Sequence, residues 1–141
     1  MISQLTVFLE NEEGRLCDAC QTIADAGINM HALFLADSAD FGIARIFCDT
    51  PLAARDALVN AKFRAAITPV LAVRVPNEKG GLAKLLTYLN DKEVNIEYGY
   101  CFSVNGTDAI DVLKIDNDAI ETQLKAAGFN PVAPKEIYTV D

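Results

Sequence analysis

The sequence predicts an α+β fold made of two copies of one βαββαβ unit, and three observations lead to this prediction. Residues 72–77 (AVRVPN) repeat residues 6–11 (TVFLEN), which sets a constant offset of 66 residues between the copies. In each copy, stretches that alternate apolar and polar residues are followed by stretches with apolar residues at helical spacing. A glycine, Gly14 or Gly80, stands between the first strand and the first helix. A duplicated unit therefore fills the chain of 141 residues.

Identical residues recur at this offset along both copies. A shift of one residue between positions 42 and 50 also pairs Asp49 with Asp116, as an insertion in a loop would. The boundary lies near Thr68-Pro69 without a flexible linker, so we predict domains at residues 1–68 and 69–141 that pack side by side. The identical pairs are Asn11/Asn77, Glu12/Glu78, Gly14/Gly80, Leu16/Leu82, Asp25/Asp91, Asn29/Asn95, Leu58/Leu124 and Phe63/Phe129.

The first copy contains the elements of the unit in order. Its helical segments have apolar faces made of Leu16, Cys20, Ile23 and Ala24 in the first helix and Ala54, Ala57 and Leu58 in the second. The predicted elements are a strand at residues 5–9, a helix from the Gly14 turn to Gly27, strands at 28–36 and 41–48 around a hairpin turn at Asp37–Asp40, and a helix opened by Thr50 as N-cap and Pro51 at its first position.

The second copy repeats this order. Asn105-Gly106 is a strong hairpin signal between its two middle strands. Each copy is therefore expected to form an antiparallel four-stranded sheet with both helices on one face, a ferredoxin-like unit. The predicted elements are strand 70–76, helix 81–92, strands 94–103 and 108–115, helix 118–127, and a last strand near 132–140.

Composition and charge exclude several classes of protein. The net charge of −8 and the absence of a Lys/Arg cluster argue against nucleic-acid binding. The first ten residues have neither a basic flank nor a small-residue cleavage site, so they do not read as a signal peptide. No apolar run approaches the ~20 residues that a membrane span needs. We therefore expect a cytoplasmic protein whose four Cys residues stay reduced.

The loop before each first helix has the chemistry of a small-molecule site. A loop that ends in Gly at a helix start presents unpaired backbone N–H groups and the positive end of the helix dipole, which suit a carboxylate. A nearby Asn offers an acceptor to an ammonium group and a donor to a carboxylate. These groups match a zwitterion. The alternative is that Asn11 and Gly14 only form the turn and that Asn29 only begins a strand.

The stretch V-F-L-E-N-E-E-G-R-L…A-D-A-G-I-N resembles an ACT domain, the small-molecule-sensing module of many amino-acid-metabolism enzymes, and so does V-R-V-P-N-E-K-G-G-L…N-D-K-E-V-N. The chain as a whole is similar to free-standing tandem ACT proteins. The resemblance implies that the ligand lies between the first loop of one unit and the start of the second strand of the other. Some serine-binding members carry a His two residues before the loop Asn, where this chain has Leu9 and Val75. That departure puts serine in doubt, but not amino-acid binding in general.

The resemblance implies a regulatory protein of amino-acid metabolism that binds an amino acid or a related metabolite and is not an enzyme. It needs no cofactor and no metal, and a regulated enzyme would be a separate chain. Because the sheet face opposite the helices is apolar, we expect a homodimer that covers Phe8, His31, Leu33, Leu35, Ile43, Arg45 and Phe47. The candidate ligand-binding residues are Asn11, Glu12, Gly14, Arg15, Leu16, Asn29, Asn77, Glu78, Lys79, Gly80, Gly81, Leu82 and Asn95.

Two other signals compete with this interpretation. Cys17-x-x-Cys20 is typical of ferredoxin-like metal carriers, but there the first Cys lies in the loop, whereas Cys17 lies three residues past Gly14. Packing of Cys20 beside Ile23 is the simpler interpretation. A thiol metal carrier and a ligand-free interaction module stay open as alternatives. The lone His31 has no orienting carboxylate near it in the sequence, which argues against a catalytic base.

Overall fold

The computed structural model describes residues 1–37 and 40–141, which form two compact units. The N-terminal unit consists of Ser3–Thr68 with Pro134–Asp141, and the C-terminal unit consists of Pro69–Ala133 with Met1–Ile2. The two chain ends are thus exchanged between the units. The domains predicted from the repeat, 1–68 and 69–141, are sequence units and stay a prediction.

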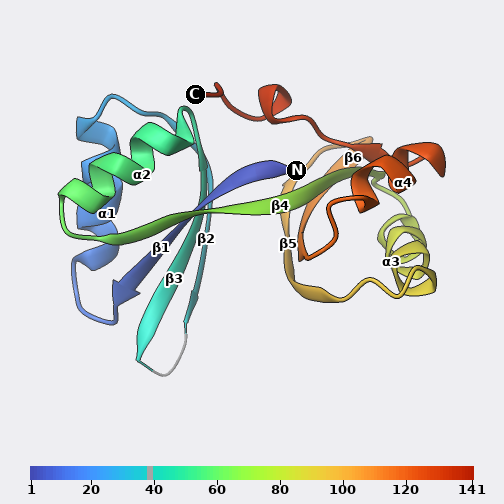
Figure 1. Ribbon diagram of the computed structural model, residues 1–141, viewed down its shortest axis with the longest axis horizontal. Coiled ribbons are helices and arrows are strands. Elements are labelled where there is room, and N and C mark those ends of the chain that lie inside the picture. The colour runs from blue at the N-terminus through green and yellow to red at the C-terminus, as the bar shows by residue number, and fades with distance from the viewer. Residues whose placement is uncertain (38–39) are drawn as a thin grey trace. The chain divides into compact units, whose positions relative to one another are not determined.

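The N-terminal unit is a ferredoxin-like βαββαβ arrangement with both helices on one face of the sheet (Figure 1). The strand order is β2-β3-β1-β4, and the pairs β1–β3 and β2–β3 are antiparallel. Apolar residues of both helices and of the inner strands form its core, with Leu5, Ile23 and Leu58 fully buried. Its elements are β1 (Ile2–Glu10), α1 (Arg15–Asp25), β2 (Met30–Asp37), β3 (Phe41–Cys48), α2 (Pro51–Asn60) and the first part of β4 (Arg64–Pro76).

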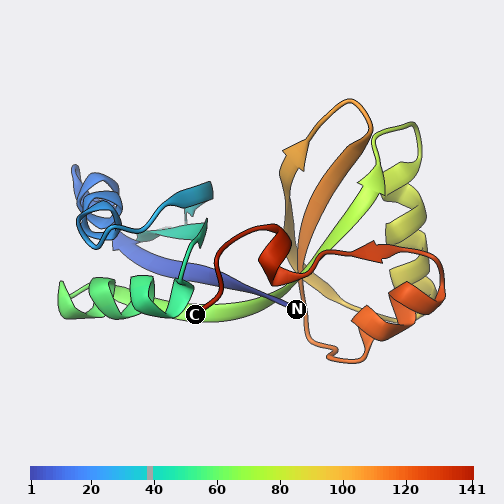
Figure 2. The same cartoon turned by 90° about the horizontal axis from the view of Figure 1, so that it is seen from above.

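The C-terminal unit repeats this plan, with α3 and α4 together on one side of its strands (Figure 2). Strand β6 pairs with β4 and β5, and the short β7 pairs with the other edge of β4. Leu85, Leu89, Ile120 and Leu124 are fully buried helix residues of its core. The elements are the second part of β4, α3 (Gly81–Asp91), β5 (Ile96–Val104), β6 (Asp108–Ile115), α4 (Ile120–Ala126) and β7 (Asn130–Pro131). The predicted fold class is confirmed.

The prediction of a last strand at residues 132–140 is wrong. Asn130–Pro131 pair with β4, and the Val132 N–H donates to the Ala72 carbonyl at 2.8 Å before a 3₁₀ turn, η1 (Pro134–Glu136), follows. Pro134 has no N–H to donate to a ladder, which explains why the pairing does not continue. The chain after Ala133 packs within the N-terminal unit instead.

This C-terminal segment is tied by hydrogen bonds to the N-terminal unit. The Thr139 N–H donates to Asp49 Oδ1 at 2.7 Å, and the Thr50 N–H donates to the Thr139 carbonyl at 2.7 Å. The Asp141 carboxylate accepts from the N–H groups of Leu52 and Ala53 at 3.1 and 2.7 Å. Thr50 stands before Pro51 as predicted, but its side chain makes no capping bond, so Asp141 caps α2.

The predicted open face of the N-terminal sheet is partly wrong. A register shift between Met30 and Ala32 places an irregularity at His31 in β2. A bulge inserts one residue and reverses the alternation beyond it. Leu33 and Leu35 therefore pair with Ile46 and Ala44 on the core face, whereas the residue opposite Arg45 is Phe34. The predicted turn at Asp37–Asp40 includes residues 38–39, which lie outside the described part of the chain.

Candidate functional site

The loops that precede α1 and α3 have the same backbone geometry. Gly14 and Gly80 each stand at the N-cap in the left-handed region, with φ of 88° and 82°. A side chain would be strained there, so both positions favour glycine. In each loop two N–H groups close turns before the helix, and the glycine carbonyl accepts the first hydrogen bond of the helix. The matching bonds are Glu12 N to Glu10 O and Glu78 N to Pro76 O, Arg15 N to Glu12 O and Gly81 N to Glu78 O, and Asp18 N to Gly14 O and Lys84 N to Gly80 O.

The second glycine of the later loop is required by the fold itself. A Cβ on Gly81 would lie 2.3 Å from the Pro76 carbonyl oxygen, a distance that no side chain tolerates. The sequence suggests that Gly81 lets a ligand approach the backbone. The structure shows that it already allows the loop to close against Pro76, so its presence is not by itself a sign of a ligand.

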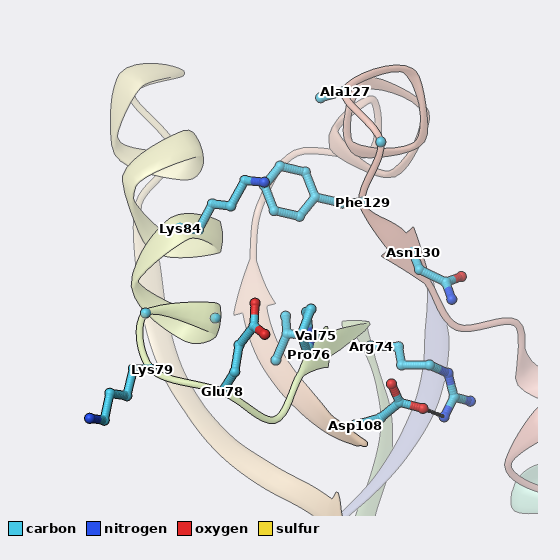
Figure 3. A pocket seen from close by; sticks show the side chains of 13 residues that line it. Arg74, Val75, Pro76, Glu78, Lys79, Lys84, Asp108, Ala127, Phe129 and Asn130 are labelled. Atoms are coloured by element: carbon cyan, nitrogen blue, oxygen red, sulfur yellow. Dashed lines mark ion pairs between the residues drawn. The ribbon is translucent and has the colours of Figure 1, made fainter.

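A pocket of about 420 Å³ opens beside this loop within the C-terminal unit (Figure 3). The loop and the start of α3 form one wall, the end of β4 forms the floor, and the segment after α4 closes the other side. In Figure 3, the Lys79 side chain points away from the pocket centre. The Glu78 side chain extends from the loop toward the space between α3 and the segment after α4. The pocket residues are Arg74, Val75, Pro76, Glu78, Lys79, Gly80, Gly81, Lys84, Asp108, Ala127, Gly128, Phe129 and Asn130.

Charges of both signs line this pocket. Arg74 forms an ion pair with Asp108 at 3.6 Å, and both side chains are about one-third exposed. Lys79 and Lys84 add positive charge beside the first turn of α3, where the N–H groups point out of the helix. Glu78 supplies a carboxylate in the same wall. The pocket can thus attract a carboxylate and an ammonium group at once.

The first loop differs because its Arg is already engaged. Arg15 Nε donates to Glu10 Oε2 at 2.8 Å, and the guanidinium lies over the Phe63 ring, 4.3 Å from its centroid. These contacts turn the Arg15 side chain back onto its own unit. In the second copy Gly81 takes the place of Arg15, which leaves Lys79 and Lys84 as the cations of that loop.

The four candidate Asn residues have different surroundings. Asn77 does not line the pocket: its side-chain amide donates to the Asn105 carbonyl at 2.6 Å and ties the loop to the hairpin between β5 and β6. Asn95 lines a pocket of about 230 Å³ whose other polar residues are mostly acidic, namely Glu93, Glu97, Asp116 and Asn117. Asn11 and Asn29 are exposed. The expected pairing of each loop with the second-strand Asn of the other unit stays a prediction.

The remaining candidate ligand-binding residues do not lie together. Glu78, Lys79, Gly80 and Gly81 line the pocket beside α3 together. Leu82 lines a separate cavity, on the other side of the helix start. In the first copy, Glu12 is exposed, and Leu16 packs against the core.

The thiols do not have the surroundings of a metal site. The buried residues of α1 are Ala19 and Ile23, so Cys20 lies at the margin of the predicted apolar stripe, and Cys17 is exposed. Burial, and then the neighbouring Cys17, raise the pKa of Cys20. A raised pKa disfavours the thiolate that metals bind. Within residues 1–37 and 40–141 no group of three or more His, Cys, Asp or Glu residues could hold a metal ion.

His31 has a partner that sequence reasoning missed. Its Nε2 lies 2.9 Å from Asp49 Oδ1, the same oxygen that accepts the Thr139 N–H. Asp49 follows β3 and is far from His31 in the sequence. In the sequence, Asp49 is marked as a candidate by its identity with Asp116 at the equivalent position of the second copy. The pair ties the strand start to the C-terminal segment.

The chain belongs to the family of ACT domain pairs, whose family model matches residues 1–128. A protein of Bacteroides thetaiotaomicron has a similar crystal structure, with a TM-score of 0.89 and 36% identity, over 96% of this chain and 94% of that one. The ligand-free regulatory subunit of aspartate kinase from Thermus thermophilus gives a TM-score of 0.65 with 17% identity, over 89% and 90% of the two chains.

The regulatory subunit of aspartate kinase from Thermus flavus gives a TM-score of 0.61 with 19% identity, over 91% and 92% of the two chains. At these identities, the two kinase subunits show a shared fold alone. No curated protein matches the chain at a significant level. Among the described residues, no helix is long and apolar enough to cross a membrane.

Proposed function

We propose that the chain binds an amino acid or a related small metabolite and uses it as a signal in the regulation of amino-acid metabolism, without catalysing a reaction. The pocket beside the Gly80 loop carries the proposal. It offers helix N–H groups and the Lys84 side chain for a carboxylate, and Glu78 for an ammonium group. Membership of the ACT domain pairs supports the same class of ligand. We keep Asn11, Asn29, Asn77 and Asn95 as proposed ligand-binding residues.

The regulated partner in this proposal is an enzyme on a separate chain, and the protein works as a homodimer in the cytoplasm. The regulatory aspartate kinase subunits with the same fold are consistent with such an arrangement. A ligand-free interaction module is the alternative that the first experiment separates from it.

The test is calorimetry with the common amino acids, after a thermal-shift screen has selected candidates. We expect one amino acid to bind, and its N-acetyl derivative and its decarboxylated amine to bind much more weakly, because each lacks one of the two charges. Lys84→Ala should weaken binding about tenfold, since a hydrogen bond to a charged group contributes about 1.5–3 kcal/mol. Lys62→Ala, at the exposed end of α2, is the control and should leave binding unchanged. If no amino acid binds, the ligand-free module is the correct interpretation.

The two loops should bind with different strength. The first loop reads Asn-Glu-Glu-Gly-Arg and the second Asn-Glu-Lys-Gly-Gly, so Lys79 replaces Glu13 where a carboxylate would arrive. Asn77→Ala should therefore weaken binding more than Asn11→Ala. Because Asn77 also holds the Asn105 carbonyl, its variant must first be shown to keep the native circular dichroism. Equal losses in the two variants would contradict the ranking.

A further inference from the structure

Asp111 is a buried acid without a partner. It lies in β6, and the residue is 8% exposed. Within the described residues 1–37 and 40–141, no hydrogen bond or ion pair holds its carboxylate. Burial raises the pKa of Asp111, with no counteracting contact. The oxygens of Asp111 are not among the fully buried atoms that lack a hydrogen bond, so they keep some contact with solvent. A carboxylate that is mostly buried and makes no hydrogen bond still favours a cation beside it.

The carboxylate belongs to the wall of a cavity of about 430 Å³ between α3 and β5. Apart from Asp111, the cavity is lined mainly by apolar residues, together with Cys101 and Tyr100. Leu82 and Cys101 are exposed, so the cavity opens to solvent at its rim. Except for Leu82, none of these residues belongs to the candidate ligand site of the loops. The lining residues are Leu82, Leu86, Ile96, Gly99, Tyr100, Cys101, Asp111 and Leu113.

The residues that line this cavity differ from their equivalents in the first copy. In β5 and β6, Gly99 pairs with Leu113 and Cys101 pairs with Asp111. At the same register positions of the first copy, Leu33 pairs with Ile46 and Leu35 pairs with Ala44. Two leucines and a methyl group are thus replaced by a glycine, a cysteine and a carboxylate.

These replacements add a charge beside apolar side chains. A Cβ on Gly99 would lie 2.7 Å from Leu113 Cδ2, so Leu113 already occupies the space next to Gly99. A carboxylate placed in this largely apolar cavity is unfavourable unless a cation enters with it.

We propose that this cavity binds a primary ammonium group carried on a short apolar body. The ammonium supplies the hydrogen-bond donors that the Asp111 oxygens lack, and the apolar body covers Leu82, Leu86 and Leu113. A zwitterionic amino acid is a poor occupant, because its carboxylate would enter an apolar cavity next to Asp111. The site is therefore distinct in its chemistry from the loop pocket beside Gly80.

Calorimetry of the full chain with three probes of the same shape tests the proposal. Benzylammonium should bind more tightly than benzyl alcohol, which lacks the charge, and than benzyltrimethylammonium, which lacks the N–H donors. Asp111→Asn should weaken benzylammonium binding about tenfold or more, as expected for loss of a charge-assisted hydrogen bond. Cys101→Leu, which restores the leucine of the first copy, should block the cavity. Asp91→Asn, on an exposed end of α3, is the matched control and should change nothing.

The pH dependence provides a second readout. Benzylammonium keeps its charge across the acidic range, so its affinity should rise with pH as Asp111 ionises, and this rise should be absent in Asp111→Asn. Burial raises the pKa of the Cys101 thiol above 9.0, which keeps it neutral in this range. Equal affinities for benzylammonium and benzyl alcohol, or unchanged binding in Asp111→Asn, would overturn the proposal. Binding of an amino acid at the loop pocket should not change in Asp111→Asn, which separates this test from that of the proposed function.

Discussion

Single residues in left-handed backbone conformation end the helices of both copies. Gly27 and Gly128 follow α1 and α4 with φ of 74° and 89°, but Lys62 and Glu93 occupy the same position after α2 and α3 with φ of 71° and 57°. At each of these ends an N–H donates back to the last turn, as the Phe63 N–H does to the Leu58 carbonyl at 2.9 Å. Glycine is the residue that this position favours.

Lys62→Gly should therefore stabilise the protein, by about 0.5–1 kcal/mol, because relief of the left-handed strain exceeds the added entropy of the unfolded chain. Urea denaturation measures the change. Lys125→Gly removes the same side chain from inside α4 and should destabilise by about 1 kcal/mol. The same sign for both variants would show that loss of the lysine, and not the backbone conformation, decides the outcome.

Asp111 should make stability depend on pH with an unusual sign. Burial raises its pKa in the folded state above the ordinary value of 3.8, so the folded state holds the proton more tightly than the unfolded state does. Its contribution to stability is present below pH 3.8 and is lost as the pH rises through the folded-state pKa. Asp111→Asn should raise the melting temperature at pH 7, and the gain should shrink in acid. Thermal denaturation at both pH values checks this, and a gain that grows in acid would contradict it.

At the scale of residues, the sequence predicted which positions need a special backbone conformation better than it predicted which side chains are in contact. Gly14 and Gly80 were predictable because a turn into a helix favours a positive φ. The Pro76 oxygen behind Gly81, the Asn105 partner of Asn77 and the contact between His31 and Asp49 were not predictable, since each depends on where a distant segment lies. Local patterns carry no information on such contacts.

The C-terminal segment caps helix α2, a role that the pattern of apolar and polar residues in the sequence does not reveal. Asp141 caps α2 from the far end of the chain, in place of the Thr50 side chain that the sequence favours. Asp141→Ala should destabilise the protein by about 0.5–2 kcal/mol, the usual effect of removing a helix cap. Asp141→Asn keeps one acceptor oxygen and should lose less. Chemical denaturation measures both, and no loss in Asp141→Ala would show that the cap does not contribute in solution.

The same segment should loosen in acid. The Thr139 N–H, followed by His31, lowers the pKa of Asp49 below its ordinary value of 3.8. The stability that this carboxylate contributes is present above pH 3.8 and is lost as the pH falls through the lowered folded-state value. Hydrogen exchange of the Thr139 amide should therefore lose protection in strong acid. Asp49→Asn should show weaker protection already at neutral pH, and unchanged protection in that variant would exclude Asp49 as the anchor.

At the scale of elements, every helix and the strands β1, β2, β3, β5 and β6 were predictable, because their apolar periods and end signals agree with the tertiary structure. For β4 only residues 70–76 had a predicted range, whereas the strand begins at Arg64 and runs through the expected boundary at Thr68-Pro69. Two errors have local causes. The irregularity at His31 reversed the faces of Leu33 and Leu35, and alternation cannot reveal such a shift. The expected last strand contains the apolar residues of a strand, but Pro134 interrupts its ladder.

At the scale of the whole molecule, strand β2 is the feature that calls for a partner. Among the described residues it pairs with β3 alone, and it forms the edge of the N-terminal sheet. Three consecutive large residues on it, Leu33, Phe34 and Leu35, are 43%, 40% and 48% exposed. An exposed apolar edge strand invites pairing with another chain, and isolated proteins usually protect such edges with charges or proline. The side chains point to both faces of the sheet, so a partner strand would cover them better than a partner face would.

We therefore expect a homodimer in which β2 of one chain lies against the other chain. Light scattering at tens of micromolar protein should give twice the mass of the chain. Phe34→Lys places a charge in the middle of the edge and should shift the protein to a monomer, because a buried unpaired charge opposes association. Val59→Lys alters an equally exposed apolar residue on α2 and should leave the dimer intact. A wild-type monomer at this concentration, or a dimer that survives Phe34→Lys but not Val59→Lys, would show that β2 is not the contact.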